Sequence, residues 1–139
     1  MNINIYINEK KLSSDSIAAI NEYIKRLSPF ANMKILTNEA VPRDDHSRNT
    51  KNYMLRTASD GKTGCHTISS PELAELINRL NSNGISRINY FIGYKDSLPD
   101  DTDAFAISYM RLSNAVLATA LAEQIYRAYT INHGITYHK

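Results

Sequence analysis

The chain has 139 residues, of which 42% are hydrophobic and 22% are charged, and these values are typical of one packed domain spanning residues 1–139. Its formal net charge of +2 is too small to indicate nucleic-acid binding by itself, so RNA contact would depend on local clusters of Lys and Arg. Cys65 is the only cysteine, no signal peptide is evident, and no apolar run is long enough to span a membrane, so we expect a soluble, cytoplasmic protein.

The first two elements are predicted to be a strand and a helix. Residues 2–7 alternate between apolar and polar side chains, which predicts a strand. In residues 13–27, isoleucine and leucine recur at helical spacing, which predicts a helix. Ser13 or Ser14 can cap this helix, and Pro29 would end it.

The middle of the chain predicts two more strands and a second helix. Residues 33–37 and 53–58 read as strands, and the polar residues 39–51 between them predict a surface loop, with or without a short helix. The sequence Ser70-Pro71-Glu72 is typical of a helix start, because it offers a cap, a proline in the first turn and a carboxylate at the positive end of the helix dipole. Gly84 suits the left-handed residue that closes this helix.

The last elements indicate an α/β fold. Residues 88–92 are almost continuously apolar, as in a central parallel strand that is buried on both faces. A short strand is predicted at 104–107 and a helix at 113–130. Strands and helices mostly alternate, so we expect a largely parallel sheet flanked by helices, with ligands bound beyond the carboxyl ends of its strands. Three loops meet this description: 57–64, 93–98 and 108–113.

Two features of these loops admit a ligand-binding or a purely structural interpretation. Gly93 ends the strand at 88–92, and it would either allow backbone to approach a ligand closely or form a plain turn. The segment 108–113 would either present free backbone amides to a polar or anionic ligand, or simply begin a helix capped by Ser113. The residues alone do not decide between these alternatives.

The last helix is apolar around much of its circumference. A surface helix of a monomer would have a clear polar face. The helix at 113–130 is therefore either buried within the chain or packed against a partner, and a twofold dimer through it is attractive for a small domain.

The carboxyl-terminal segment gathers chemically active side chains. Arg127, His133, Tyr137, His138 and Lys139 lie within a short stretch, where aromatic rings could stack on bases and cations could hold phosphates. The alternative is a solvated chain end.

Other chemical motifs are weak. Cys65-His66 lacks the second pair of ligands that a closed zinc site needs, so we expect no metal, and Asp44-Asp45-His46 reads as a solvated turn. No Ser-His-Asp or Cys-His order, phosphate-binding P-loop or dinucleotide fingerprint stands out. The residues by themselves therefore indicate a dimeric α/β domain with a ligand crevice at its strand ends.

Four segments resemble the RlmH-type SPOUT methyltransferases of bacteria. Glu-Gln-Ile-Tyr-Arg-Ala at 123–128 and Gly-Ile-Thr-Tyr-His-Lys at 134–139 resemble the carboxyl-terminal signature of that family. Residues 90–93 and 22–27 are similar to a strand ending in glycine and to the first helix of its members. The resemblance covers nearly the whole chain and is most specific at its end.

This resemblance implies a fold, a cofactor and a reaction. Members of the family have a trefoil knot in the carboxyl half, dimerise through the last helix, bind S-adenosylmethionine in the knot, and methylate N3 of a pseudouridine in large-subunit ribosomal RNA. By resemblance, the cofactor cradle of this chain would be Thr57, Gly93, Ile107, Ser108, Tyr109, Met110, Arg111 and Leu112.

The resemblance also assigns roles to the tail. Tyr137 and His138 would reach the substrate base in the site of the partner subunit, with neutral His138 accepting the N3 proton. Arg127 and Lys139 would hold RNA phosphates.

The chain departs from the family pattern at three places. Tyr94 replaces a second glycine, Ser113-Asn114 replaces Pro-His, and Ala118 replaces an arginine. A tyrosine at 94 would crowd the adenosyl pocket, and the other two changes would remove substrate contacts. Two alternatives to the ribosomal methyltransferase therefore stay open: a knotted RNA-binding or assembly protein with little or no catalysis, and a methyltransferase with another RNA target.

Overall fold

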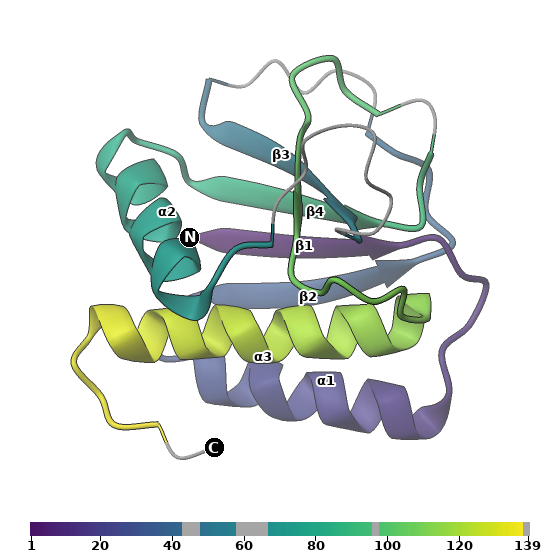
Figure 1. Cartoon of the computed structure of the whole chain (residues 1–139), viewed down its shortest axis with the longest axis horizontal. Helices are drawn as coiled ribbons and strands as arrows, with labels where there is room; N and C mark the ends of the chain where they lie inside the picture. Colours follow the sequence, from purple (N-terminus) through teal and green to yellow (C-terminus); the bar gives the residue numbers. More distant parts are fainter. Residues whose placement is uncertain (43–47, 58–66, 96–97, 138–139) are drawn as a thin grey trace.

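A parallel sheet and three helices make up the part of the chain that the structure describes. The computed structural model describes residues 1–42, 48–57, 67–95 and 98–137 (Figure 1). In chain order, its elements are β1 (Asn2–Ile7), α1 (Ser14–Leu27), β2 (Asn32–Thr37), β3 (Thr50–Arg56), α2 (Ser70–Ser82), β4 (Arg87–Ile92), β5 (Asp103–Ala106) and α3 (Asn114–Asn132).

The five strands lie in the order β2-β1-β4-β3-β5, and every neighbouring pair is parallel. This confirms the expected α/β class. β4 lies at the centre of the sheet, and the side chains of Ile88, Tyr90 and Ile92 are fully buried, as the apolar run predicted. Because all the strands run the same way, their carboxyl ends share one edge, and Ile7 of β1 pairs with Ile92 of β4 at that edge.

All three helices pack on one face of the sheet. Alternate residues of β1, namely Ile3, Ile5 and Ile7, face a continuous apolar core that includes buried side chains of α1, α2 and α3. Figure 1 shows α1 and α3 running beside each other along this side of the sheet. Tyr6 and Phe91 are also buried, but they lie outside this core because they point to the opposite face.

The predicted boundary of β3 is wrong. The strand begins at Thr50, although residues 50 and 51 were expected in a polar loop. Thr50 and Asn52 pair with the amino-terminal half of β4, where Arg87 and Asn89 face the same side of the sheet. Polar side chains therefore extend this strand on the face away from the helices, and such residues do not produce an apolar alternation.

The other boundaries differ from prediction by a few residues. β5 runs from Asp103 rather than 104, because Asp103 pairs with Tyr53. The cap of α2 is Ser69 rather than Ser70: Ser69 Oγ accepts the Glu72 N–H at 3.3 Å, and the Glu72 carboxylate accepts the Ser69 N–H at 3.2 Å. Gly84 has a φ of +81°, as its expected place after the helix requires.

Candidate functional site

A crevice with a volume of about 510 Å³ opens at the carboxyl ends of β3 and β4. Thr57, Gly93, Arg111 and Leu112, four of the eight predicted cofactor residues, line it together. They come from the end of β3, the end of β4 and the segment before α3, so the fold brings three distant parts of the chain to one place. This is the position at which parallel sheets bind their ligands.

Gly93 and Asn114, which both line the crevice, make a tight contact. Gly93 has a φ of +80°, and a Cβ atom on it would lie 2.6 Å from Asn114 Nδ2. Asn114 Nδ2 donates to Glu9 Oε1 at 3.0 Å, and Asn8 Nδ2 donates to the Gly93 carbonyl oxygen at 3.0 Å. Glycine is therefore required here both by backbone conformation and by the close approach of α3.

Tyr94 lines the crevice, and two contacts fix the position of its side chain. Its ring meets Phe91 edge-on at a centroid distance of 5.9 Å, and its hydroxyl donates to the Glu39 carbonyl oxygen at 3.0 Å. Partial burial, followed by the nearby Tyr6 and Glu39, raises the pKa of the Tyr94 phenol, so the hydroxyl stays protonated and remains a donor.

The remaining predicted cofactor residues do not line this crevice. Ile107 and Ser108 line a neighbouring hollow of about 440 Å³ beside the start of α2, and Leu112 lines both spaces. Ser108 Oγ accepts the Met110 N–H at 3.1 Å and so shapes the turn that follows. Tyr109 and Met110 are 72% and 71% exposed, so their side chains lie on the surface.

Two cations in the crevice were not predicted. Arg56 and Lys95 line it together with Arg111, and none of its lining residues is acidic in the part of the chain that the structure describes. Arg56 ends β3 and Lys95 lies three residues after β4, and a position at a strand end is the sequence signal that identifies them. Three cations beside apolar Leu112 suit a ligand that carries both an anionic group and an apolar ring.

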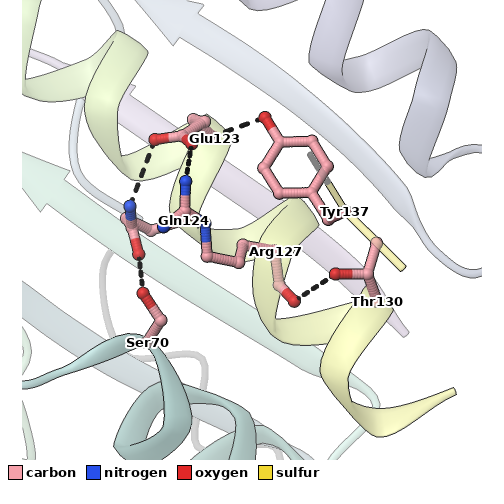
Figure 2. A network of polar contacts seen from close by, with 6 residues as sticks. All are labelled: Ser70, Glu123, Gln124, Arg127, Thr130 and Tyr137. Atoms are coloured by element: carbon pink, nitrogen blue, oxygen red, sulfur yellow. Dashed lines mark hydrogen bonds and ion pairs between the residues drawn. The ribbon is translucent and has the colours of Figure 1, made fainter. Parts of the chain in front are cut away.

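A second polar cluster ties the carboxyl-terminal segment to α3 (Figure 2). Arg127 Nη2 lies 2.5 Å from Glu123 Oε1, and the Tyr137 hydroxyl donates to the same oxygen at 3.4 Å. The Arg127 guanidinium lies 5.2 Å from the centroid of the Tyr137 ring. Gln124 donates to the other Glu123 oxygen at 3.1 Å and accepts from Ser70 Oγ, so the cluster reaches α2.

This cluster places two of the predicted tail residues. The Arg127 side chain is only 16% exposed and pairs with Glu123, so within this chain it binds a carboxylate. Burial and a hydrogen bond with Tyr23 raise the pKa of Tyr137, which keeps its hydroxyl protonated. His138 and Lys139, and also Asp44-Asp45-His46 and Cys65-His66, lie outside the described residues.

His133 has a structural position. Its Nδ1 lies 2.8 Å from the Tyr129 carbonyl oxygen at the end of α3, and its ring contacts Phe30 at a centroid distance of 4.5 Å. These contacts close the helix and pack the ring, so His133 is removed from the crevice chemistry.

Most of the apolar surface of α3 is buried within the chain. Leu121, Ala122 and Ile125 are fully buried in the core. Of the two alternatives for this helix, the structure therefore confirms burial within the chain. Val116 is 52% exposed and lines a hollow between α1 and α3 together with Tyr23. A dimer through α3 would therefore have to use the exposed side near Val116.

Comparison with known proteins identifies the family. A family model described as "Predicted SPOUT methyltransferase" matches residues 1–138. The chain belongs to the SPOUT methyltransferase family. The resemblance seen at residues 123–128 and 134–139 is thereby confirmed over almost the full length, and the α/β fold agrees with it.

Several relatives of this SPOUT methyltransferase carry one name. The protein "Ribosomal RNA large subunit methyltransferase H 1" of Thermoanaerobacter sp. (strain X514) is 32% identical over 139 residues, covering all of both chains. "Ribosomal RNA large subunit methyltransferase H" of Oenococcus oeni is 30% identical over 145 residues, covering 87% of this chain and 88% of the relative. The protein of that name from Clostridioides difficile is 30% identical over 163 residues, covering all of both chains.

The three departures that the resemblance implies have different surroundings. Tyr94 and Asn114 line the crevice, whereas Ala118 is fully buried in the core. An arginine at position 118 would need a buried partner for its charge, and alanine removes that need.

In the described part of this SPOUT methyltransferase, no helix is long and apolar enough to cross a membrane. The same residues contain no group of three or more His, Cys, Asp or Glu side chains that could hold a metal ion.

Proposed function

We propose that this SPOUT methyltransferase transfers a methyl group from S-adenosylmethionine to N3 of a pseudouridine in large-subunit ribosomal RNA. The observation that carries the proposal is the crevice, where Thr57, Gly93, Arg111 and Leu112 meet at the strand ends. The names of the relatives support ribosomal RNA as the substrate class. The chain would act as a homodimer, with its carboxyl half threaded as a trefoil knot.

The residues of the crevice fit the carboxylate and the adenine ring of this methyl donor. Its volume of about 510 Å³ lies within the usual range for small-molecule sites. Arg56, Lys95 and Arg111 would hold the carboxylate of the donor, and the apolar side chains of Leu112 and Leu117 would pack against its adenine ring. When bound, S-adenosylmethionine supplies an activated methyl group on a sulfonium centre. Positioning of the base by the protein therefore contributes most of the rate.

The carboxyl-terminal tail would contact the substrate base and accept its proton. N3 of the base loses its proton as it forms the new bond to carbon, and the neutral imidazole of His138 would accept that proton. Tyr137 is held by Glu123 and Arg127 one residue before His138, so this cluster would orient the end of the chain toward the site of the partner subunit. Lys139 would bind a phosphate of the RNA.

Mass mapping of ribosomal RNA tests this function. Cells that lack the gene should lose methylation of one pseudouridine in the large-subunit RNA, and the purified protein with S-adenosylmethionine should restore it. Unchanged methylation in those cells would mean that the enzyme acts on another RNA.

A second candidate is a SPOUT-fold RNA-binding protein with weak or absent catalysis. The Asn114 amide favours it, because it packs against Gly93 in the crevice at a position where the resemblance implies histidine in the family. Restoration experiments with the purified protein separate the two candidates, since a scaffold would bind the RNA without methylating it.

A further inference from the structure

The face of the sheet that points away from the helices carries a polar groove. A hollow of about 360 Å³ spans β2, β1 and β4 on this face. It is lined by Asn2, Asn4, Asn32, Lys34 and Arg87, with Tyr6 and Leu36 at its carboxyl end. We call this hollow the asparagine groove. Its β1 residues Asn2, Asn4 and Tyr6 alternate with the core residues of that strand, so the groove lies on the opposite side of the sheet from α3, and a dimer formed through that helix would leave it open.

A ladder of side-chain amides leads across the sheet to this groove. Asn4 Nδ2 donates to Asn89 Oδ1 at 2.9 Å, and Asn89 Nδ2 donates to Asn52 Oδ1 at 3.0 Å. Asn52 Nδ2 then donates to Asp101 Oδ1 at 3.3 Å. Asn4, Asn89 and Asn52 stand side by side on β1, β4 and β3, and their side chains are at most 7% exposed.

The ladder has a fixed direction, which leaves an acceptor at its groove end. The Asp101 carboxylate can only accept, so Asn52 must turn its amide nitrogen toward it, and Asn89 and Asn4 must follow. Asn4 Oδ1 is consequently the terminal acceptor, and it is buried without a hydrogen-bond partner among the described residues. A buried carbonyl oxygen of this kind calls for a donor, and a ligand seated in the groove would supply one.

The groove also has a positive charge. Lys34 stands directly opposite Asn4 on β2, and Arg87 stands opposite Asn2 on β4. Both side chains are exposed, and no lining residue of the groove within the described part of the chain is acidic. The fitting ligand therefore carries anionic groups at two points and a hydrogen-bond donor between them.

From this arrangement we propose that the asparagine groove binds a single-stranded segment of the RNA substrate; this inference rests on the proposed function. Phosphates would lie on Lys34 and Arg87, and a base amino or imino group would donate to Asn4 Oδ1. A single strand fits better than a duplex, because its unpaired bases can turn an amino or imino group toward an atom recessed in the sheet.

The groove leads toward the cofactor crevice. Tyr6 at its end stacks on Phe91 with a centroid distance of 5.0 Å, and Phe91 contacts Tyr94, which lines the crevice. RNA held in the groove would thus leave it beside the methylation site. The groove would act as a second contact that sets which nucleotide enters the crevice.

The RNA affinity of variants with altered charge tests whether the asparagine groove binds RNA. The probe is a fluorescein-labelled single-stranded RNA of about 12 nucleotides, a length within the usual range of single-strand sites, and the readout is anisotropy. Lys34→Glu should raise the dissociation constant on the order of tenfold, and Lys34→Gln should lower the slope of log affinity against log salt by about 0.7. Lys25→Glu is the matched control, because Lys25 is an exposed lysine on α1, on the side of the sheet opposite the groove. It should change the affinity less than about twofold.

Three results would contradict RNA binding in the asparagine groove. The first is an equal loss of affinity in Lys34→Glu and Lys25→Glu, and the second is competition by uridine monophosphate as effective as that by the RNA itself. The third is a Lys34→Gln protein with a lower melting temperature but normal RNA affinity. That result would show that Lys34 stabilises the fold beside Asn4 and does not bind RNA. Calorimetry with S-adenosylmethionine keeps the two proposals apart, since a groove variant should bind it as the wild type does.

Discussion

Asn114 of α3 lies directly against Gly93 at the end of β4, with its amide nitrogen 2.6 Å from the place where a Cβ atom on Gly93 would be. The contact joins the strand that ends at the crevice to the helix that begins there. Asn114 is also one of the positions at which the resemblance implies a departure from the family pattern. The geometry of the crevice therefore depends on this pair, and the first prediction concerns it.

Gly93→Ala should destabilise the protein by about 2–4 kcal/mol, because it combines a strained positive φ with a steric clash. Gly84→Ala is the matched control, since Gly84 has nearly the same φ, +81°, but no atom within 4 Å of its added Cβ. It should cost only about 1 kcal/mol. Urea unfolding measures both. Adding Asn114→Ala to Gly93→Ala should recover part of the difference, and a strictly additive double variant would contradict the contact.

Glu123→Gln should lower stability by about 1–2 kcal/mol, because the 16%-exposed Arg127 would lose its charged partner. The pair Glu22–Arg26 has the same i,i+4 spacing on α1, but its side chains are 48% and 52% exposed. Glu22→Gln should therefore leave the urea midpoint almost unchanged. Equal shifts in the two variants would mean that the Glu123 cluster contributes no more than a surface ion pair.

Alkaline pH should weaken the fold. Burial raises the pKa of Tyr53 and of Tyr129 to about 12. A pKa raised above its unfolded value of about 10 stabilises the folded state below pH 10, and this stabilisation is lost as the pH rises from about 10 to 12. Unfolding free energies measured across this window should fall, and Tyr53→Phe should flatten the decline. A flat profile in the wild type would contradict the prediction.

Val116→Glu should convert a dimer into monomers on gel filtration, because Val116 is 52% exposed on α3 beside the hollow with α1. Leu121→Glu is the contrasting variant. It places a charge in the core of the chain itself, where Leu121 is fully buried, so it should unfold the protein rather than separate folded subunits. An unchanged elution volume for folded Val116→Glu would exclude this part of α3 as the dimer contact.

Removal of residues 137–139 should abolish methyl transfer while S-adenosylmethionine still binds, since the proposed function assigns the tail to the RNA base, whereas the crevice is built from β3, β4 and the start of α3. Methyl transfer to RNA and calorimetry measure the two properties separately. Equal loss of both would mean that the tail is only structural, through its contact with Glu123 and Arg127.

Apolar patterns predicted the sheet and its central strand well. β4 reads as a continuous apolar run because both of its faces are covered near its end, where Tyr90 and Phe91 are fully buried on opposite sides. The start of β3 was missed because Thr50 and Asn52 face the polar side of the sheet. Asparagines at alternate positions, as in Asn2 and Asn4, are the sequence signal of that second face.

The candidate site was predicted less completely, for a physical reason. Sequence position places Thr57 and Gly93 at strand ends, and the fold brings them together as expected. Spacing cannot tell which residues of the segment 107–112 turn inward, and there Tyr109 and Met110 face solvent. The pairing of Arg127 with Glu123 was visible as an i,i+4 spacing, but the return of Tyr137 onto that pair depends on tertiary folding.

Calorimetric titration of the purified protein with S-adenosylmethionine is the most direct test of the central claim that the crevice beside Gly93 holds the methyl donor. We predict one site per chain with a micromolar dissociation constant, and a clear loss of affinity when Arg111, which lines the crevice, is changed to glutamate. No measurable binding at millimolar S-adenosylmethionine would contradict the claim and would leave the protein as an RNA-binding member of its family.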